Sequence, residues 1–138
     1  MREIKFRIFD KKENEMFYSN MYQNKTSMIY GLGNFLKECS DIEEPIMQFT
    51  GLKDKNGVEI YEGDIIKDSS NRLMTVEWDR RVGTSRFIFR VINTIGHIKV
   101  GRFVNTHEWI MPDDNDIEVV GNIYENPELL KGEIWASN

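Results

Sequence analysis

The residue types that most often carry nucleophilic or acid–base catalysis are scarce in this sequence, which has one cysteine, Cys39, and two histidines, His97 and His107. Nucleophilic catalysis needs a nucleophile beside a base that a third group holds in place. No HExxH spacing or comparable motif surrounds these residues. A lone cysteine is usually a small buried apolar residue, and His107 shares strand parity with Trp109, which favours a structural role. We therefore expect no catalytic residues and predict that the protein is not an enzyme.

Carboxylates gather in an acidic run that contains Asp113, Asp114, Asp116 and Glu118. Their oxygens could hold a hard cation such as magnesium or calcium, as in a metal-dependent hydrolase. The run lacks the spacing and the closing glutamate of an EF-hand loop, so we favour a solvated acidic loop and expect no bound metal. The chain also lacks the glycine-rich loops that hold nucleotide phosphates, and we expect no cofactor.

Residues 80–102 form a basic strip, and no acidic residue occurs between Arg80 and His107. We expect Arg86 and Arg90 on the outward side of a strand whose other side is aromatic, and such a face could bind phosphates. Alternatively, the acidic run neutralises the strip within the fold. The formal net charge of −5 disfavours non-specific binding to nucleic acid. The candidate nucleic-acid-binding residues are Arg80, Arg81, Arg86, Arg90, Lys99 and Arg102.

The elements that must position these residues follow from apolar side chains at every second position, the period of a strand. Residues 3–18 predict a hairpin, with a polar turn between two apolar runs. Two further strands have their apolar residues on one face, and these residues are Met74, Val76 and Trp78 in one strand and Phe87, Phe89 and Val91 in the other.

Glycine and asparagine mark the turns. Asn56 and Gly57 both tolerate a positive φ and predict a tight connection between two strands, and Gly63-Asp64 predicts a second sharp corner. The segment 19–45 is the least regular part of the sequence. It is compatible with one or two helical turns around Phe35 or with a long excursion over the surface, because glycines disfavour a helix that starts before Asn34.

Length and composition limit the classes of protein to which this chain can belong. The chain has 138 residues, of which 40% are hydrophobic and 30% charged, so it suits one domain with a true core. Its longest uncharged stretch has eleven residues (26–36), too few to span a membrane. The charges in the opening segment exclude a signal-peptide core, and we expect a cytoplasmic protein without a membrane partner.

Short strands with closely spaced turns predict a mainly β fold. We expect a small, strongly bent barrel with an extra hairpin and short helical pieces. The sequence contains no repeat, low-complexity tract or linker. It therefore predicts a single domain over residues 1–138, with a small subdomain within the segment 19–45 as the alternative.

Three motifs give the sequence a family resemblance: the opening REIKFRIFD, the segment MQFTGLKDKNGVEIYEGDII and the ending IEVVGNIYENPELL. In this order they resemble the YopX family of phage and prophage proteins, and the resemblance spans nearly the whole chain. It implies a β-rich fold with a small barrel of the Src-homology type, encoded by a phage or prophage and present in the host cytoplasm. It implies no activity, and residues 131–138 extend beyond the usual ending of the family.

These observations favour a non-catalytic binding or assembly module that acts through contacts with a partner protein or through self-association. Three aromatic residues could contribute to such contacts. The candidate partner-binding residues are Tyr18, Tyr22 and Trp135. Nucleic-acid binding through the basic strip is the alternative.

Overall fold

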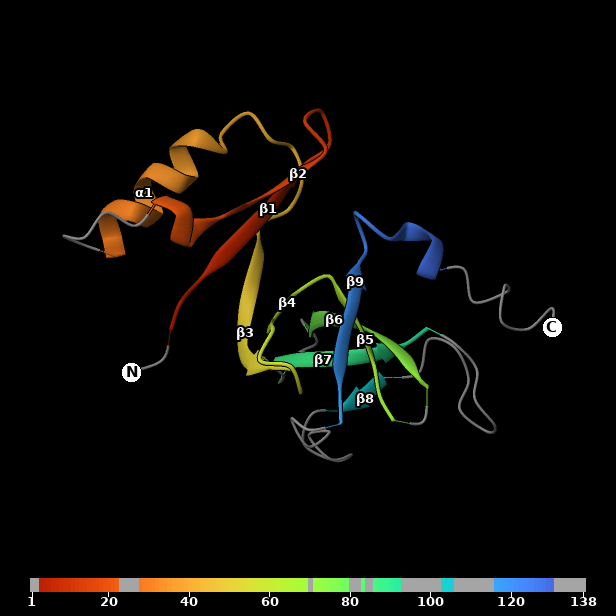
Figure 1. Ribbon diagram of the computed structural model, residues 1–138. Helices are drawn as coiled ribbons and strands as arrows, with labels where there is room; N and C mark the ends of the chain where they lie inside the picture. The colour runs from red at the N-terminus through yellow and green to blue at the C-terminus, as the bar shows by residue number, and fades with distance from the viewer. Residues whose placement is uncertain are drawn as a thin grey trace. The chain divides into compact units, whose positions relative to one another are not determined.

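The structure, a computed structural model, describes residues 3–22, 28–69, 71–79, 83, 86–92, 103–105 and 116–130 (Figure 1). These residues form nine short strands, one α-helix and two 3-10 helices, which confirms the predicted mainly β fold with short helical pieces. No helix within this described part is long and apolar enough to cross a membrane. The chain divides into two units, a first unit (Met1–Gly51) and a second unit (Leu52–Asn138). This division does not test the single domain expected from the sequence, which stays a prediction.

The predicted hairpin over residues 3–18 is confirmed. It consists of two antiparallel strands, β1 (Phe6–Asp10) and β2 (Glu15–Tyr18). The Asp10 carboxylate accepts the backbone N–H of Lys12 at 2.8 Å, so a short polar side chain shapes the turn between the strands.

A 3-10 helix, η1 (Ser19–Tyr22), and an α-helix, α1 (Met28–Glu38), belong to the same unit. The sequence is compatible with one or two helical turns or a surface excursion, and it disfavours a helix that starts before Asn34. That expectation is wrong, because α1 begins at Met28 and has eleven residues. The helix buries one face, on which Phe35 is fully buried and packs in a cluster with Ile8 of β1. Packing of this face outweighs the poor helix propensity of the two glycines in α1.

Strand β3 (Met47–Lys53) pairs with β1 in the first unit and, at its far end, forms a hairpin with β4 (Glu59–Tyr61). The strand order in this sheet is β2-β1-β3-β4. The predicted turn connects β3 to β4, and Gly57 has a φ of 80°. Asn56 does not have a positive φ, so glycine alone supplies the backbone geometry that the sequence allowed for both residues.

The second unit contains a five-stranded antiparallel sheet in the order β8-β7-β6-β5-β9. Its strands are β5 (Asp64–Lys67), β6 (Leu73–Asp79), β7 (Arg86–Val91), β8 (Phe103–Asn105) and β9 (Glu118–Asn122). The predicted corner lies before β5, where Gly63 has a φ of 82°. The sheet is strongly curled into a half-barrel, which confirms the bent barrel expected from the sequence. A second 3-10 helix, η2 (Pro127–Leu130), follows β9.

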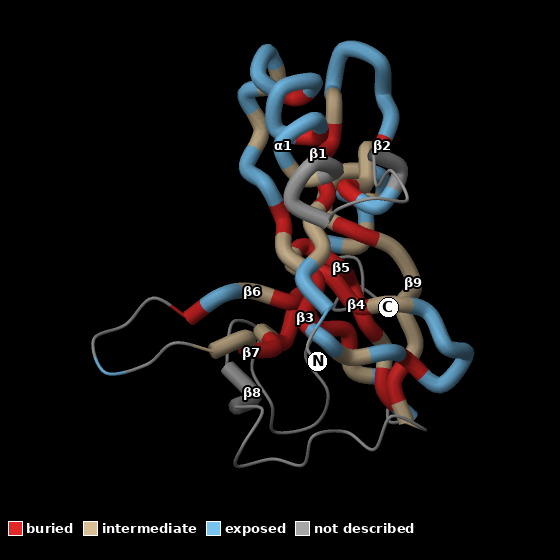
Figure 2. Tube along the Cα trace, turned by 90° about the vertical axis from the view of Figure 1, so that its left-hand side faces the viewer, coloured by how far each residue is buried: buried red, intermediate tan, exposed pale blue. Residues whose placement is uncertain are grey.

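Alternate residues of β6 and β7 form the core of the second unit. The buried cluster consists of Ile60, Ile66, Met74, Val76, Phe89, Val91 and Ile117. Trp78, expected on the same face, is 36% exposed, and Figure 2 shows β6 becoming exposed before its end. Trp78 packs edge-to-face on Phe87 with ring centroids 4.7 Å apart. Although Trp78 alternates with the buried Met74 and Val76, it therefore stacks at the margin of the core and not within it.

Candidate functional site

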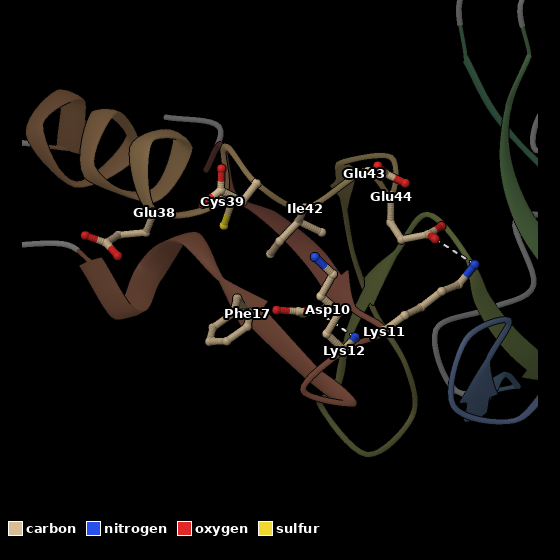
Figure 3. A pocket seen from close by; sticks show the side chains of 10 residues that line it. Asp10, Lys11, Lys12, Phe17, Glu38, Cys39, Ile42, Glu43 and Glu44 are labelled. Atoms are coloured by element: carbon tan, nitrogen blue, oxygen red, sulfur yellow. Dashed lines mark hydrogen bonds and ion pairs between the residues drawn. The ribbon is translucent and has the colours of Figure 1, made fainter.

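A pocket of about 370 Å³ opens in the first unit, between the hairpin and the chain that follows α1 (Figure 3). This volume is near the lower end of the range of roughly 300–1,000 Å³ that is typical of ligand pockets. Its lining comes from two parts of the sequence. The lining residues are Asp10, Lys11, Lys12 and Phe17 from the hairpin, and Glu38, Cys39, Asp41, Ile42, Glu43 and Glu44 from the end of α1 and the following segment.

The floor of the pocket is apolar. Phe17, Cys39 and Ile42 line the pocket and also belong to the hydrophobic cluster around Ile8 and Phe35. Because Ile8 lies on β1 and Phe35 lies on α1, the packing that holds the helix on the hairpin also builds this floor.

Cys39 is buried, as expected of a lone cysteine, with 6% of its surface exposed. Burial raises the pKa of the Cys39 thiol, and the negative charges of Glu38 and Asp10 raise it further. The thiolate is the reactive form of cysteine. A raised pKa therefore leaves this thiol protonated and unreactive near neutral pH.

The rim of the pocket is acidic, with five carboxylates against two ammonium groups. One of these ammonium groups is paired, because Lys11 Nζ lies 2.6 Å from Glu44 Oε1 (Figure 3). The side chains of Glu38, Asp41 and Glu43 are exposed. The pocket thus combines an apolar floor with a negatively charged edge, an arrangement suited to binding.

The two described arginines of the basic strip lie on β7 and face carboxylates of the neighbouring strand β6. Arg90 Nε is 2.5 Å from Glu77 Oε2, and Arg86 Nε is 3.9 Å from Asp79 Oδ2. Carboxylates of the adjacent strand thus offset charge on both arginines. Neutralisation by the acidic run stays a prediction, because Asp113 and Asp114 lie outside the described residues. The role of the strip in nucleic-acid binding stays a prediction.

The other sites expected from the sequence are described only in part. Tyr18 is half-buried on β2, and Tyr22 is placed only as the last residue of η1. Outside the described residues lie Arg80, Arg81, His97, Lys99, Arg102, His107, Asp113, Asp114 and Trp135.

Two members of the acidic run, Asp116 and Glu118, line a second, smaller pocket of about 260 Å³ in the second unit. Glu118 Oε2 lies 3.5 Å from Lys55 Nζ, so a lysine already offsets part of its charge. Within the described ranges, no group of three or more His, Cys, Asp or Glu residues is arranged to hold a metal ion.

Sequence reasoning missed a carboxylate with a central structural position, Asp54. Its Oδ1 accepts the backbone N–H groups of Asn56 at 2.8 Å and Val58 at 2.9 Å. Its Oδ2 accepts the backbone N–H of Val119 at 2.9 Å. Burial opposes ionisation of Asp54, but these three donors and the charge of Lys55 outweigh it and lower the pKa of the carboxyl. The available signal was an aspartate two residues before Asn-Gly, a position that favours hydrogen bonds to the turn.

Two other buried aspartates of the second unit, Asp64 and Asp68, also accept backbone N–H groups. Asp64 Oδ2 accepts the backbone N–H of Tyr61 at 2.8 Å. Asp68 Oδ1 accepts the backbone N–H of Arg72 at 2.9 Å, and its Oδ2 accepts the guanidinium of the same residue. Asp54, Asp64 and Asp68 therefore serve as anchors for turns.

Comparison with known proteins agrees with the motifs. Residues 5–131 match the family described as YopX protein. The crystal structure of protein EF1440 from Enterococcus faecalis is 31% identical in sequence and has a TM-score of 0.51, and the match covers 95% of this chain and 100% of that chain. No curated protein matches the sequence. The resemblance inferred from the motifs is confirmed: the chain belongs to the YopX family.

Proposed function

We propose that this chain is a non-catalytic binding or assembly module, encoded by a phage or prophage, that acts in the host cytoplasm through protein contacts. The observation that carries the proposal is the open pocket of the first unit, with its apolar floor and exposed carboxylates. A surface of this kind can hold a side chain of another protein, because it offers both apolar contact and charge.

The non-catalytic part of the proposal is supported by how the described acidic and thiol groups are used. Asp54, Asp64 and Asp68 hold backbone N–H groups of turns. The raised pKa of the Cys39 thiol opposes a nucleophilic role. These groups stabilise the structure, and the exposed acids of the pocket rim are left for recognition.

The proposal is tested by two measurements on the full chain. Light scattering over a wide concentration range reports self-association. Cross-linking of the tagged chain in cells infected by the encoding phage reports complexes with other proteins. We expect a discrete oligomer or a reproducible cross-linked complex. A chain that stays monomeric at every concentration and forms no specific complex in cells would contradict the proposal.

Nucleic-acid binding is the competing function, and the pairing of Arg90 with Glu77 and of Arg86 with Asp79 weighs against it. Carboxylates beside these arginines reduce the charge available to phosphates. We expect no gel shift with DNA or RNA at low salt. A shift that is lost in the double variant Arg86→Glu and Arg90→Glu, while the fold is kept, would favour the competing function instead.

A further inference from the structure

We propose that the pocket of the first unit receives a lysine or arginine side chain from an extended basic segment of a partner protein. This inference rests on the proposed function and adds the chemistry of the partner. It follows from the shape and the charge of one described site.

The pocket has an apolar floor and acidic residues at its edge, and these two parts match the two halves of a long basic side chain. Lysine and arginine have an apolar stem and a cationic head, and they bury the stem while the head stays at the surface. In the pocket, Phe17, Cys39 and Ile42 form the apolar floor. Glu38 and Glu43 also line the pocket and are exposed, so a cationic head at the edge of the pocket would have carboxylates nearby.

The charge of the rim is not balanced within the pocket itself. Five carboxylates meet two ammonium groups, and Lys11 is paired with Glu44 at 2.6 Å. Figure 3 shows Glu38 at one end of the pocket and Glu43 at the other. An extended segment that crosses the pocket can therefore place cationic groups near both ends.

Two carboxylates of the rim also act on the floor of the pocket. Burial is the main cause of the raised pKa of the Cys39 thiol, and the negative charges of Glu38 on α1 and Asp10 on β1 raise it further. Carboxylates from the two sides thus act on the same point of the floor. A field that disfavours an anionic thiolate favours a cation at this place and disfavours phosphates and acidic peptides.

The test uses the full, isotopically labelled chain and two peptides as probes. The basic probe is acetyl-GLKARLG-amide, and the acidic probe, acetyl-GLEAELG-amide, has the same apolar residues. Chemical-shift changes in amide NMR spectra report the site and the affinity. We expect the basic probe to shift the amide signals of residues 10–12, 17 and 38–44. Its affinity should fall as the salt concentration is raised. The acidic probe should cause no saturable change in these signals.

A matched pair of variants separates the pocket from general charge. The double variant Glu38→Gln and Glu43→Gln removes two rim carboxylates. The double variant Glu13→Gln and Glu15→Gln removes two exposed glutamates of the same unit that do not line the pocket. We expect the rim variant to weaken the basic probe about fivefold, as for two solvated ion pairs, and the control to change its affinity less than about twofold.

Several outcomes would overturn the inference. They are equal binding of both probes, basic-probe shifts outside the pocket, and equal weakening by the two variants. A second copy of the chain would be the occupant instead if wild-type protein dimerises through residues 38–44 and the basic probe does not compete. In that case the proposed function stands and only the nature of the partner is wrong. A wild-type chain that stays monomeric and forms no specific complex in cells would contradict the proposed function itself.

Discussion

Replacing Asp54 with asparagine tests whether one buried carboxylate links the β3–β4 turn to strand β9. In the wild-type chain this side chain accepts three backbone N–H groups, and the donor at Val119 is 65 residues away in sequence. An amide at this position keeps one oxygen for the turn. Its NH₂ group is a donor and cannot accept the N–H of Val119.

The expected cost follows from the loss of that contact. A hydrogen bond to a charged group contributes about 1.5–3 kcal/mol, so the substitution Asp54→Asn should lower the free energy of unfolding by about 2 kcal/mol. The control is Asp116→Asn, which removes a charge from a half-buried aspartate of the same unit. It should change the free energy of unfolding by less than about 0.5 kcal/mol.

Urea denaturation followed by tryptophan fluorescence is the assay, because Trp78, Trp109 and Trp135 all belong to the second unit. The pKa of Asp54 is lowered in the folded chain. Its contribution is therefore fully present above the unfolded pKa of about 3.9 and is lost as the pH falls through the lowered folded value. The difference between wild type and Asp54→Asn should be largest near neutral pH and should shrink below about pH 4. Equal effects of the two variants, or a difference independent of pH, would refute the reasoning.

Three further predictions concern packing and reactivity. Phe89→Ala should lower the free energy of unfolding by about 3–5 kcal/mol, because Phe89 is 1% exposed, and the half-exposed Trp78→Ala should cost clearly less in the same denaturation experiment. Gly121→Ala should cost about 1–3 kcal/mol, since the added Cβ would lie 2.5 Å from Asn126 Oδ1; an unchanged thermal midpoint would contradict this contact. The Cys39 thiol should react with iodoacetamide much more slowly than free cysteine at neutral pH and should accelerate at a higher pH than a free thiol does, because its pKa is raised.

Local patterns account for the parts of the fold that the sequence predicted. The hairpin at residues 3–18 and the strand of Phe89 follow from period-two alternation, which each strand carries within itself. The turn at Gly57 and the corner at Gly63 follow from the tolerance of glycine for a positive φ. Such features need no knowledge of distant residues.

Contacts between distant segments account for the errors. The length of α1 depends on the packing of Phe35 against Ile8, which offsets two unfavourable glycines. The exposure of Trp78 depends on where the core ends, and alternation along one strand does not contain that boundary. In α1, tertiary packing outweighs the low helix propensity of the glycines. For Trp78, the local pattern of the strand carries no information about where the core ends.

The candidate site could not be predicted for the same reason. Its floor brings Phe17 together with Cys39 and Ile42, which belong to the segment that is least regular in sequence. Its negative charge comes from acidic residues of the hairpin and of the end of α1 and the following segment. In the sequence these residues are far apart and resemble ordinary solvated acids. The sequence instead drew attention to Arg86 and Arg90, whose carboxylate partners on β6 become apparent only from the strand register.

The most direct measurement is a quantitative comparison of the proteins captured by three tagged baits in infected cells. The baits are the wild-type chain, the rim variant Glu38→Gln with Glu43→Gln, and the control variant Glu13→Gln with Glu15→Gln. If the pocket is the recognition site, a partner with an exposed basic segment is captured equally by wild type and control and is depleted with the rim variant. Equal capture by all three baits would contradict the account.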